Sequence, residues 1–299
     1  MNITRAIETA FKRFLPSPFA IAILLTLLTI VLALVFTKGP TDEVHLFAVL
    51  SYWENGIWNN ALLVFAYQMM LILVLGHILV LSAPMNSLIE RLTGWVSNTQ
   101  SAVVLVSVST MLVAFFNWGL GLIFGAILAR KVAEAAQQRG FSINYPLVGA
   151  AGYVGLMIWH GGISGSAPSK VSESGHLESL MQGISDPSIA AQLPELIPYS
   201  ATIFSLPNLV IFGLLLLLVP LVLRWMAKKT PTAPTHLPIY KNTMEDEGPA
   251  QGADRLDRSK VMGVGFGLLV LGAFVYQYHQ EITQWIITPN MLNFLMLGL

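Results

Sequence analysis

The chain has 299 residues, of which 55% are hydrophobic and only 11% are charged, and its formal net charge is zero. Its mean hydropathy is +0.66. A soluble domain carries about 25% charged residues, so this composition excludes an ordinary soluble fold and indicates an integral membrane protein. No basic run suggests a nucleic-acid partner, and the absence of cysteine excludes disulfides, thiolate nucleophiles and cysteine-based metal sites.

Two apolar stretches begin the chain. The first, residues 19–36, is followed by Lys38-Gly39-Pro40 rather than by a small-residue cleavage site, so we interpret it as a retained span and not as a signal peptide. A second charge-free stretch at residues 61–81 predicts another span. Its polar residues Gln68 and His77 are expected to pack against protein, because polar groups facing lipid are costly.

The next apolar run has an unusual length. No charged residue lies between Arg91 and Arg130, yet Asn117-Trp118-Gly119-Leu120-Gly121 interrupts the run. Residues 101–116 make roughly 24 Å of helix and residues 119–129 add roughly 16 Å, whereas each crossing needs about 20 apolar residues. Two full spans do not fit, so the length predicts a re-entrant hairpin over residues 101–129 that turns at Asn117. Irregular backbone at that depth is tolerated only beside protein or a water-filled cavity, so the turn predicts a binding site.

The following span predicts a broken helix. Residues 146–159 are apolar and run into His160-Gly161-Gly162-Ile163-Ser164-Gly165-Ser166-Ala167-Pro168, where three glycines and a proline cannot continue a helix at low cost. This break and the hairpin tip both lie about 15 residues from an internal start, so we expect them to face each other at a similar depth, somewhat beyond the midplane.

Charge sets the orientation of the remaining segments. Residues 85–99 predict an amphipathic helix along the inner interface, a further span is expected at residues 203–223, and residues 224–260 form a polar linker rich in Lys and Arg. Because basic loops stay inside, we place this linker and the N-terminus in the cytoplasm. Residues 261–299 begin a second half, and their last apolar run is too short to span a bilayer.

The two breaks suggest how a charged solute is held. A helix beginning after Asn117 points its partly positive N-terminus into the membrane, which favours an anion, and unwound carbonyls suit a small cation. No Asp, Glu, Lys or Arg lies in any predicted span, so backbone dipoles, Asn, Ser and His160 must hold the substrate. This favours a singly charged anion with an apolar tail, for which Trp118 and Trp159 supply walls.

Plainer interpretations stay open. Asn117 also fits the cap of a kinked helix, residues 161–166 fit an external turn, and both tryptophans fit interfacial anchors. His160 fits a solvated or packed histidine, and Gly119, Gly121 and Gly125 have the small-residue spacing of helix contacts. For Gly125 we favour helix contact.

Two segments carry a resemblance to a known family. Residues 116–126 read Phe-Asn-Trp-Gly-Leu-Gly-Leu-Ile-Phe-Gly-Ala, and residues 159–168 read Trp-His-Gly-Gly-Ile-Ser-Gly-Ser-Ala-Pro. Both resemble the signatures of the short-chain fatty acid transporters of the AtoE type, and the resemblance covers essentially the whole chain. It implies a multi-pass carrier of the bacterial inner membrane for monocarboxylates such as acetoacetate or butyrate.

The resemblance also implies an architecture and a site. The chain is similar to the wider ion-transporter superfamily, with an inverted-repeat first half at residues 1–223 and the start of a second half at 261–299. Because the family's second hairpin lies beyond residue 299, we expect the N-terminal part of a longer protein. The candidate substrate-binding residues are, in chain order, Asn117, Trp118, Gly119, Gly121, His160, Gly161, Gly162, Ser164, Gly165 and Ser166.

The function expected from these observations is secondary transport of a short-chain fatty acid anion through the lipid bilayer, with Na⁺ or H⁺ as the candidate coupling ion and no other cofactor. A homo-oligomer is a candidate assembly. One alternative is a carrier for a dicarboxylate or an amino acid on the same fold, which the missing intramembrane arginine disfavours. A passive channel is another, as is an enzyme using His160 with Ser164 or Ser166, although no acid or metal-ligand spacing accompanies that histidine.

Overall fold

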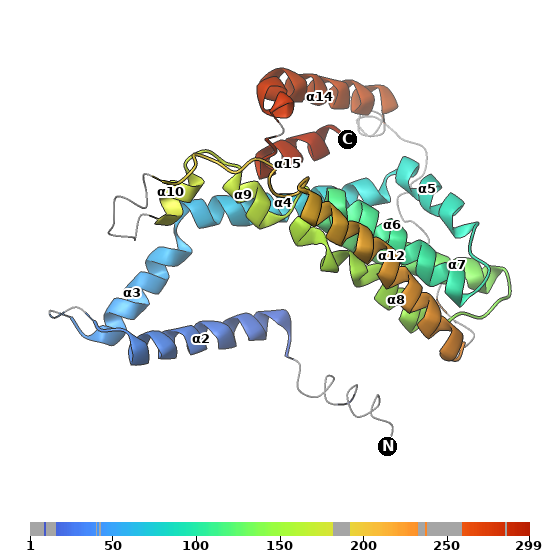
Figure 1. The fold of residues 1–299 in the computed structure, drawn as a ribbon, viewed down its shortest axis with the longest axis horizontal. Coiled ribbons are helices and arrows are strands. Elements are labelled where there is room, and N and C mark those ends of the chain that lie inside the picture. The colour runs from blue at the N-terminus through green and yellow to red at the C-terminus, as the bar shows by residue number, and fades with distance from the viewer. Residues whose placement is uncertain are drawn as a thin grey trace. The chain divides into compact units, whose positions relative to one another are not determined.

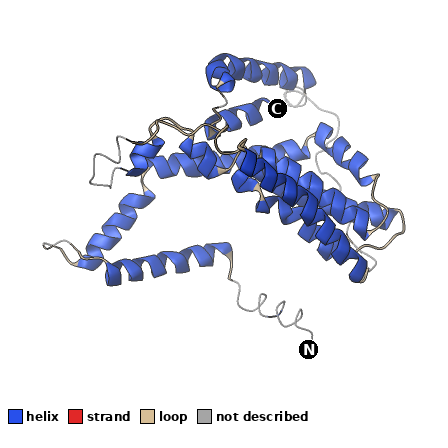
Figure 2. Ribbon diagram, viewed as in Figure 1, coloured by secondary structure: helices blue, strands red, loops and turns tan. Residues whose placement is uncertain are grey.

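The computed structural model describes residues 9, 16–39, 41, 43–181, 192–232, 237, 259–284 and 286–299. Every secondary-structure element that these residues form is a helix (Figure 2). Six helical segments among them are long and apolar enough to cross a membrane, namely Pro18–Phe36, Leu62–Leu81, Thr99–Phe116, Tyr145–Val171, Leu206–Lys229 and Lys260–Thr283. The chain is therefore an all-α polytopic membrane protein, as its composition predicts.

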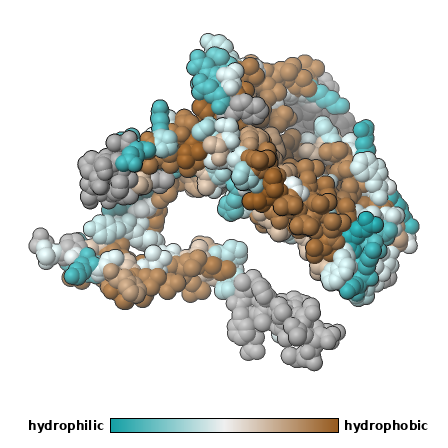
Figure 3. All heavy atoms as spheres, viewed as in Figure 1, coloured by the Kyte–Doolittle hydropathy of each residue, from teal (hydrophilic) through white to brown (hydrophobic). Residues whose placement is uncertain are grey.

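The chain forms two units, Met1–Tyr67 and Gln68–Leu299. In the first, α2 (Pro18–Phe36) begins at Ser17, whose hydroxyl accepts the Ala20 N–H, and none of its residues is buried. An apolar helix exposed on all sides is typical of contact with lipid, and Figure 3 shows its apolar surface. The sequence did not predict α3 (His45–Ile57), which packs against α2 and buries only Ala48 and Val49.

The second unit is built around four helices that lie side by side in Figure 1, which are α6 (Thr99–Phe116), α7 (Trp118–Gln138), α8 (Tyr145–Tyr153) and α12 (Leu206–Lys229). The largest buried apolar cluster lies among them and includes Val103, Phe124 and Leu128. The outer face of α12 remains apolar and exposed (Figure 3), as expected for a helix in lipid. Two further helices precede α6: α4 (Asn60–Leu81), which contains the boundary between the units, and α5 (Ala83–Thr93).

The helices α6 and α7 form the predicted hairpin. Only Asn117 separates them. At the other, open end of the hairpin, Arg139 after α7 is bonded to the segment before α6: its Nη1 donates to the carbonyls of Thr93 and Val96 at 3.2 and 3.3 Å. The backbone N–H of Asn144 also donates to Thr99 Oγ1 at 3.0 Å. The chain therefore enters and leaves this element at the same end of the unit, and re-entry into a membrane stays a prediction.

The broken helix differs in detail from its predicted boundaries. The α-helix α8 ends at Tyr153, six residues before the expected end of the span, and continues as two 3₁₀ segments, η1 (Val154–Met157) and η2 (Trp159–Gly161). Here Gly155 approaches α6 so closely that a Cβ on it would lie 2.8 Å from the Ala114 side chain. A short helix, α9 (Ser166–Val171), resumes after the break.

The remaining helices extend the predicted boundaries. The helix α12 runs six residues past residue 223, and α14 (Lys260–Thr283) continues past residue 278 after a kink at Tyr278. A further helix, α15 (Pro289–Gly298), packs on α14, and α10 (His176–Met181) follows α9. The amphipathic helix expected at residues 85–99 is shorter, because α5 ends before Gly94. Most of the predicted linker, residues 233–236 and 238–258, lies outside the described residues.

Candidate functional site

The hairpin tip is a single buried asparagine. Asn117 has an extended backbone (φ −146°, ψ 118°), ends α6 and caps α7, and its Oδ1 accepts the Leu120 N–H at 2.9 Å. Asparagine suits this position because its side-chain oxygen replaces a missing backbone acceptor at the first turn of a helix. The N-terminus of α7 therefore begins at a fully buried residue, and its direction relative to a membrane stays a prediction.

The tip and the broken helix are joined by two hydrogen bonds. The backbone N–H of Trp118 donates to Ser164 Oγ at 2.8 Å, and the backbone N–H of Ile163 donates to the Phe115 carbonyl at 2.7 Å. Gly162 lies against the same carbonyl, and a Cβ on it would be 2.6 Å from the Phe115 oxygen. The structure thus brings together the two segments that the sequence predicts to meet.

Two residues that the sequence analysis missed hold the break in place. Asn208 on α12 donates through Nδ2 to the carbonyls of Gly161 and Ile203, at 2.9 and 2.7 Å. Tyr199 is fully buried, and its hydroxyl donates to the Ile163 carbonyl at 2.7 Å and lies 2.8 Å from Ser169 Oγ. Burial raises the pKa of Tyr199 to about 12, so its phenol is neutral at physiological pH.

The tryptophans of the two segments also meet. The rings of Trp118 and Trp159 lie 5.2 Å apart at an angle of 54°, within the range of favourable aromatic contacts. The exposed His160 contacts Trp159, with 4.0 Å between ring centroids and an angle of 40° between the rings. The Ser164 oxygen accepts from the Trp118 N–H, and an enzyme that uses His160 with Ser164 or Ser166 stays an alternative prediction.

The tip carries two buried donors without partners. Asn117 Nδ2 and Trp118 Nε1 have no hydrogen-bond acceptor in the described part of the chain. A buried unpaired donor costs about 1–3 kcal/mol. Each of these two consecutive residues can therefore donate a hydrogen bond to an acceptor that comes from outside the protein. Among the described residues, no group of three His, Cys, Asp or Glu is placed to hold a metal ion.

The other predicted site residues lie at helix contacts or at the start of α9. A Cβ on Gly119 would lie 2.9 Å from Ile72 Cγ2 on α4, and a Cβ on Gly121 would lie 2.5 Å from Ala114 Cα on α6. Both glycines therefore allow helices to approach each other. Gly165 precedes α9 and lies against the carbonyl of His160, and Ser166 begins α9.

The position of the tip can be measured along α12. Phe115, near the end of α6, stacks on Phe212 with 4.4 Å between ring centroids. Phe212 lies six residues after the start of α12, which is roughly 9 Å along a helix of roughly 36 Å. At the opposite end, Asn144 Nδ2 donates to the Pro231 carbonyl beside the open end of the hairpin. The hairpin therefore extends past the middle of α12 and stops before its start.

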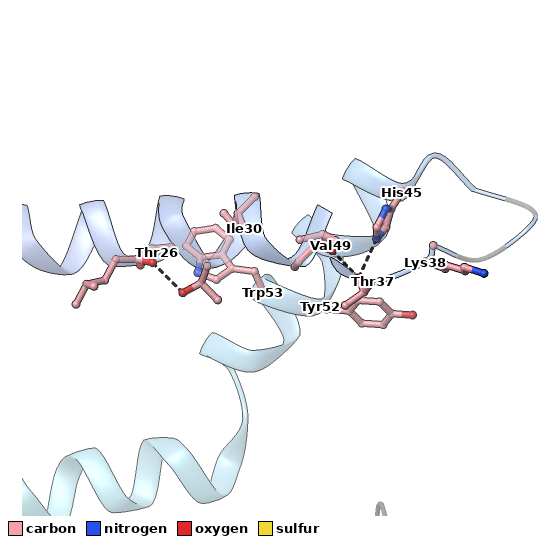
Figure 4. Close-up of a pocket in the computed structure, with 12 residues that line it drawn as sticks. Thr26, Ile30, Thr37, Lys38, His45, Val49, Tyr52 and Trp53 are labelled. Atoms are coloured by element: carbon pink, nitrogen blue, oxygen red, sulfur yellow. Dashed lines mark hydrogen bonds between the residues drawn. The ribbon is translucent and has the colours of Figure 1, made fainter. Parts of the chain in front are cut away.

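A separate cavity in the first unit contains none of these residues. It has a volume of about 660 Å³ and lies between α2 and α3, where Trp53 and Ile30 contribute to its lining (Figure 4). The hydroxyls of Thr26 and Thr29 bond the carbonyls one turn back in α2, and Thr37 lies 3.2 Å from His45 Nε2. The threonine hydroxyls of this cavity are thus engaged locally, and among the described residues no buried unpaired donor lines it.

These observations define the class of the protein: a polytopic membrane protein with a helical hairpin whose uncharged tip meets a broken helix. The sequence model of the short chain fatty acid transporter family matches residues 1–299. The chain belongs to this family, which agrees with the resemblance of its two signature segments.

Two relatives carry names that provisionally describe them as short-chain fatty acid transporters. The protein of Escherichia coli (strain K12) is 33% identical over 309 residues, which cover 100% of this chain and 64% of that protein. The protein of Haemophilus influenzae (strain ATCC 51907 / DSM 11121 / KW20 / Rd) is 29% identical over 288 residues, covering 92% of this chain and 60% of that protein. The chain thus spans less than two thirds of the length of these relatives. No solved structure matches it.

Proposed function

We propose that this chain takes part in secondary transport of short-chain fatty acid anions, such as butyrate or acetoacetate, across the bacterial inner membrane, with its N-terminus in the cytoplasm. Family membership and the names of the two relatives support this proposal. The six helices long enough to cross a membrane support a multi-pass arrangement.

The observation that carries the proposal is the pair of buried, unpartnered donors at the hairpin tip, Asn117 Nδ2 and Trp118 Nε1. A carboxylate is an acceptor with two oxygens, and hydrogen bonds to a charged group contribute about 1.5–3 kcal/mol each. The N-terminus of α7 adds a partial positive charge at the same place. The tip therefore has the chemistry to hold one carboxylate without a charged side chain.

The uncharged character of the site favours a monocarboxylate. None of the predicted site residues carries a formal charge at neutral pH when His160 is neutral. A second carboxylate buried there would have no countercharge, and burying an unpaired charge is costly. A co-transported Na⁺ or H⁺ would offset the single negative charge of the substrate during the crossing.

The hairpin tip and the broken helix suggest which part of the protein moves during transport. Because Ser164 and Ile163 are hydrogen-bonded to the hairpin tip, the hairpin and the broken helix are expected to move together. In this proposal, alternating access follows from rigid displacement of these paired elements around the bound anion.

The test is Asn117→Asp in the complete gene product, with uptake of labelled butyrate measured in membrane vesicles. Aspartate keeps the helix cap, since its oxygen can accept the Leu120 N–H, but it replaces the Nδ2 donor by a carboxylate oxygen. Losing one bond of about 1.5–3 kcal/mol to the anion predicts a fall in uptake of about 10- to 150-fold.

The matched control is Asn59→Asp. Asn59 is exposed, and its Oδ1 caps α4 by accepting the Leu62 N–H at 3.1 Å, so the same change is made at a cap outside the site. We expect this variant to transport normally. Wild-type uptake by Asn117→Asp, at equal protein levels, would refute the assignment of the tip as the carboxylate site.

A further inference from the structure

We propose that an apolar cavity beside the hairpin tip holds the hydrocarbon tail of the transported anion and sets its length. This inference rests on the proposed function and extends it to α14 and α15, which lie outside both signature segments. The cavity has a volume of about 260 Å³. Phe116 and Ile163 form one side, two residues of α14 contribute, and the other side is formed by residues from Ile287 to Leu295.

Two residues that line the cavity directly precede residues of the proposed carboxylate site. Phe116 immediately precedes Asn117, and Ile163 immediately precedes Ser164. The Ile163 N–H bond to the Phe115 carbonyl, 2.7 Å long, holds these two lining residues side by side. In this proposal, an anion whose carboxylate meets the tip donors places its tail in this cavity.

The wall opposite the tip is fixed to the broken helix. The hydroxyl of Ser172 donates to the Ile287 carbonyl at 3.1 Å, directly beside the start of α15. On α15, Met291 and Leu292 are 2% and 3% exposed, so their side chains are held in place by contacts within the unit. The cavity is thus bounded on both sides by segments that are attached to the hairpin tip or to the break.

Its chemistry and size match a short alkyl tail. Every lining residue is Phe, Ile, Leu or Met, so a second carboxylate entering the cavity would lose its hydration without gaining a partner. Pockets for drug-sized ligands measure about 300–1,000 Å³, and this cavity lies below that range. We therefore expect it to accept a few methylene groups and to exclude long fatty acids and dicarboxylates.

The test alters the cavity volume at one position. Leu295→Ala enlarges the cavity and Leu295→Phe fills it, and uptake of acetate, butyrate and hexanoate is compared in vesicles containing the complete gene product. Burial of one methylene changes affinity about fourfold. We expect Leu295→Phe to raise KM for hexanoate at least fourfold more than for acetate, and Leu295→Ala to shift preference in the opposite direction.

The matched controls are Leu297→Ala and Leu297→Phe. Leu297 lies on the same helix and is 49% exposed, away from the cavity lining. Its variants are expected to keep the wild-type dependence on tail length. If the Leu295 variants change uptake of all three acids by the same factor, or follow the controls, the tail cavity is refuted.

A binding measurement separates this inference from the transport function. Residues 1–299 contain no cysteine, so Leu295→Cys and Leu297→Cys each introduce one thiol into this part of the protein. Its alkylation by N-ethylmaleimide is measured on the peptide that contains it. We expect hexanoate to protect the thiol at position 295 more than acetate does, and to leave the thiol at 297 unaffected. Protection without transport would refute the proposed function and keep the cavity, whereas transport without protection would refute the cavity alone.

Discussion

The contact between Gly162 and the Phe115 carbonyl makes a quantitative prediction about how the site is assembled. In Gly162→Ala, the new Cβ would lie 2.6 Å from the Phe115 oxygen and 3.1 Å from its Cα. Relieving this clash moves the break away from α6, which costs about 1–3 kcal/mol for overpacking. It also weakens the bond from the Ile163 N–H to the same oxygen, worth about 0.5–1.5 kcal/mol. We therefore expect a loss of about 2–4 kcal/mol in unfolding free energy.

The assay combines thermal unfolding in detergent with hydrogen exchange of the Ile163 amide. A loss of about 2–4 kcal/mol corresponds to a decrease in Tm of roughly 4–16 °C, and the amide should exchange faster than in the wild type. The control is Gly149→Ala on α8, where a Cβ meets nothing within 4 Å, so stability should stay equal or rise by about 0.5–1 kcal/mol. Equal Tm values for the two variants, with Ile163 still protected, would refute the reasoning.

Two further predictions concern the residues that hold the break. Asn208→Leu should lower the unfolding free energy by about 1–3 kcal/mol, because the Gly161 carbonyl loses its donor; a wild-type Tm would contradict this. Burial raises the pKa of Tyr199 to about 12, above its ordinary value of about 10. The neutral phenol therefore contributes fully to the unfolding free energy below pH 10, and this contribution is lost as pH rises from 10 to 12. The wild type should therefore lose on the order of 2–3 kcal/mol more than Tyr199→Phe across that range, and parallel unfolding curves for the two proteins would contradict it.

The hairpin could be predicted from the sequence because its evidence is local. The run between Arg91 and Arg130 is too short for two spans and carries one polar interruption, and these facts place the turn at Asn117, where the structure has it. The pairing of the tip with the break near Ser164 could also be predicted, since both lie at a similar distance from basic residues at one end.

Other features depend on tertiary contacts that no local pattern records. Tyr199 and Asn208 lie outside the signature segments, and their roles appear only when α12 is placed beside the break. The end of α8 at Tyr153 depends on the approach of Gly155 to α6, which a reading of single spans cannot detect. A clue to Asn208 existed, because an asparagine in the first turn of an apolar helix needs a partner within the protein.

The glycines of the hairpin signature bear on the proposal that an uncharged site holds an anion. Gly121 brings α7 against Ala114, and Gly125 lies against the Gly152 carbonyl, so α7 lies close to both α6 and α8. This close contact keeps Asn117 fully buried and holds its unpaired donor away from water. Hydrogen bonds are stronger in such a low-dielectric environment, and donors already fixed in place lose little entropy when a ligand arrives. If Asn117 binds the anion as proposed, the glycines support that role, because the helix contacts they allow keep its donor rigid and away from water, so that no charged side chain is needed.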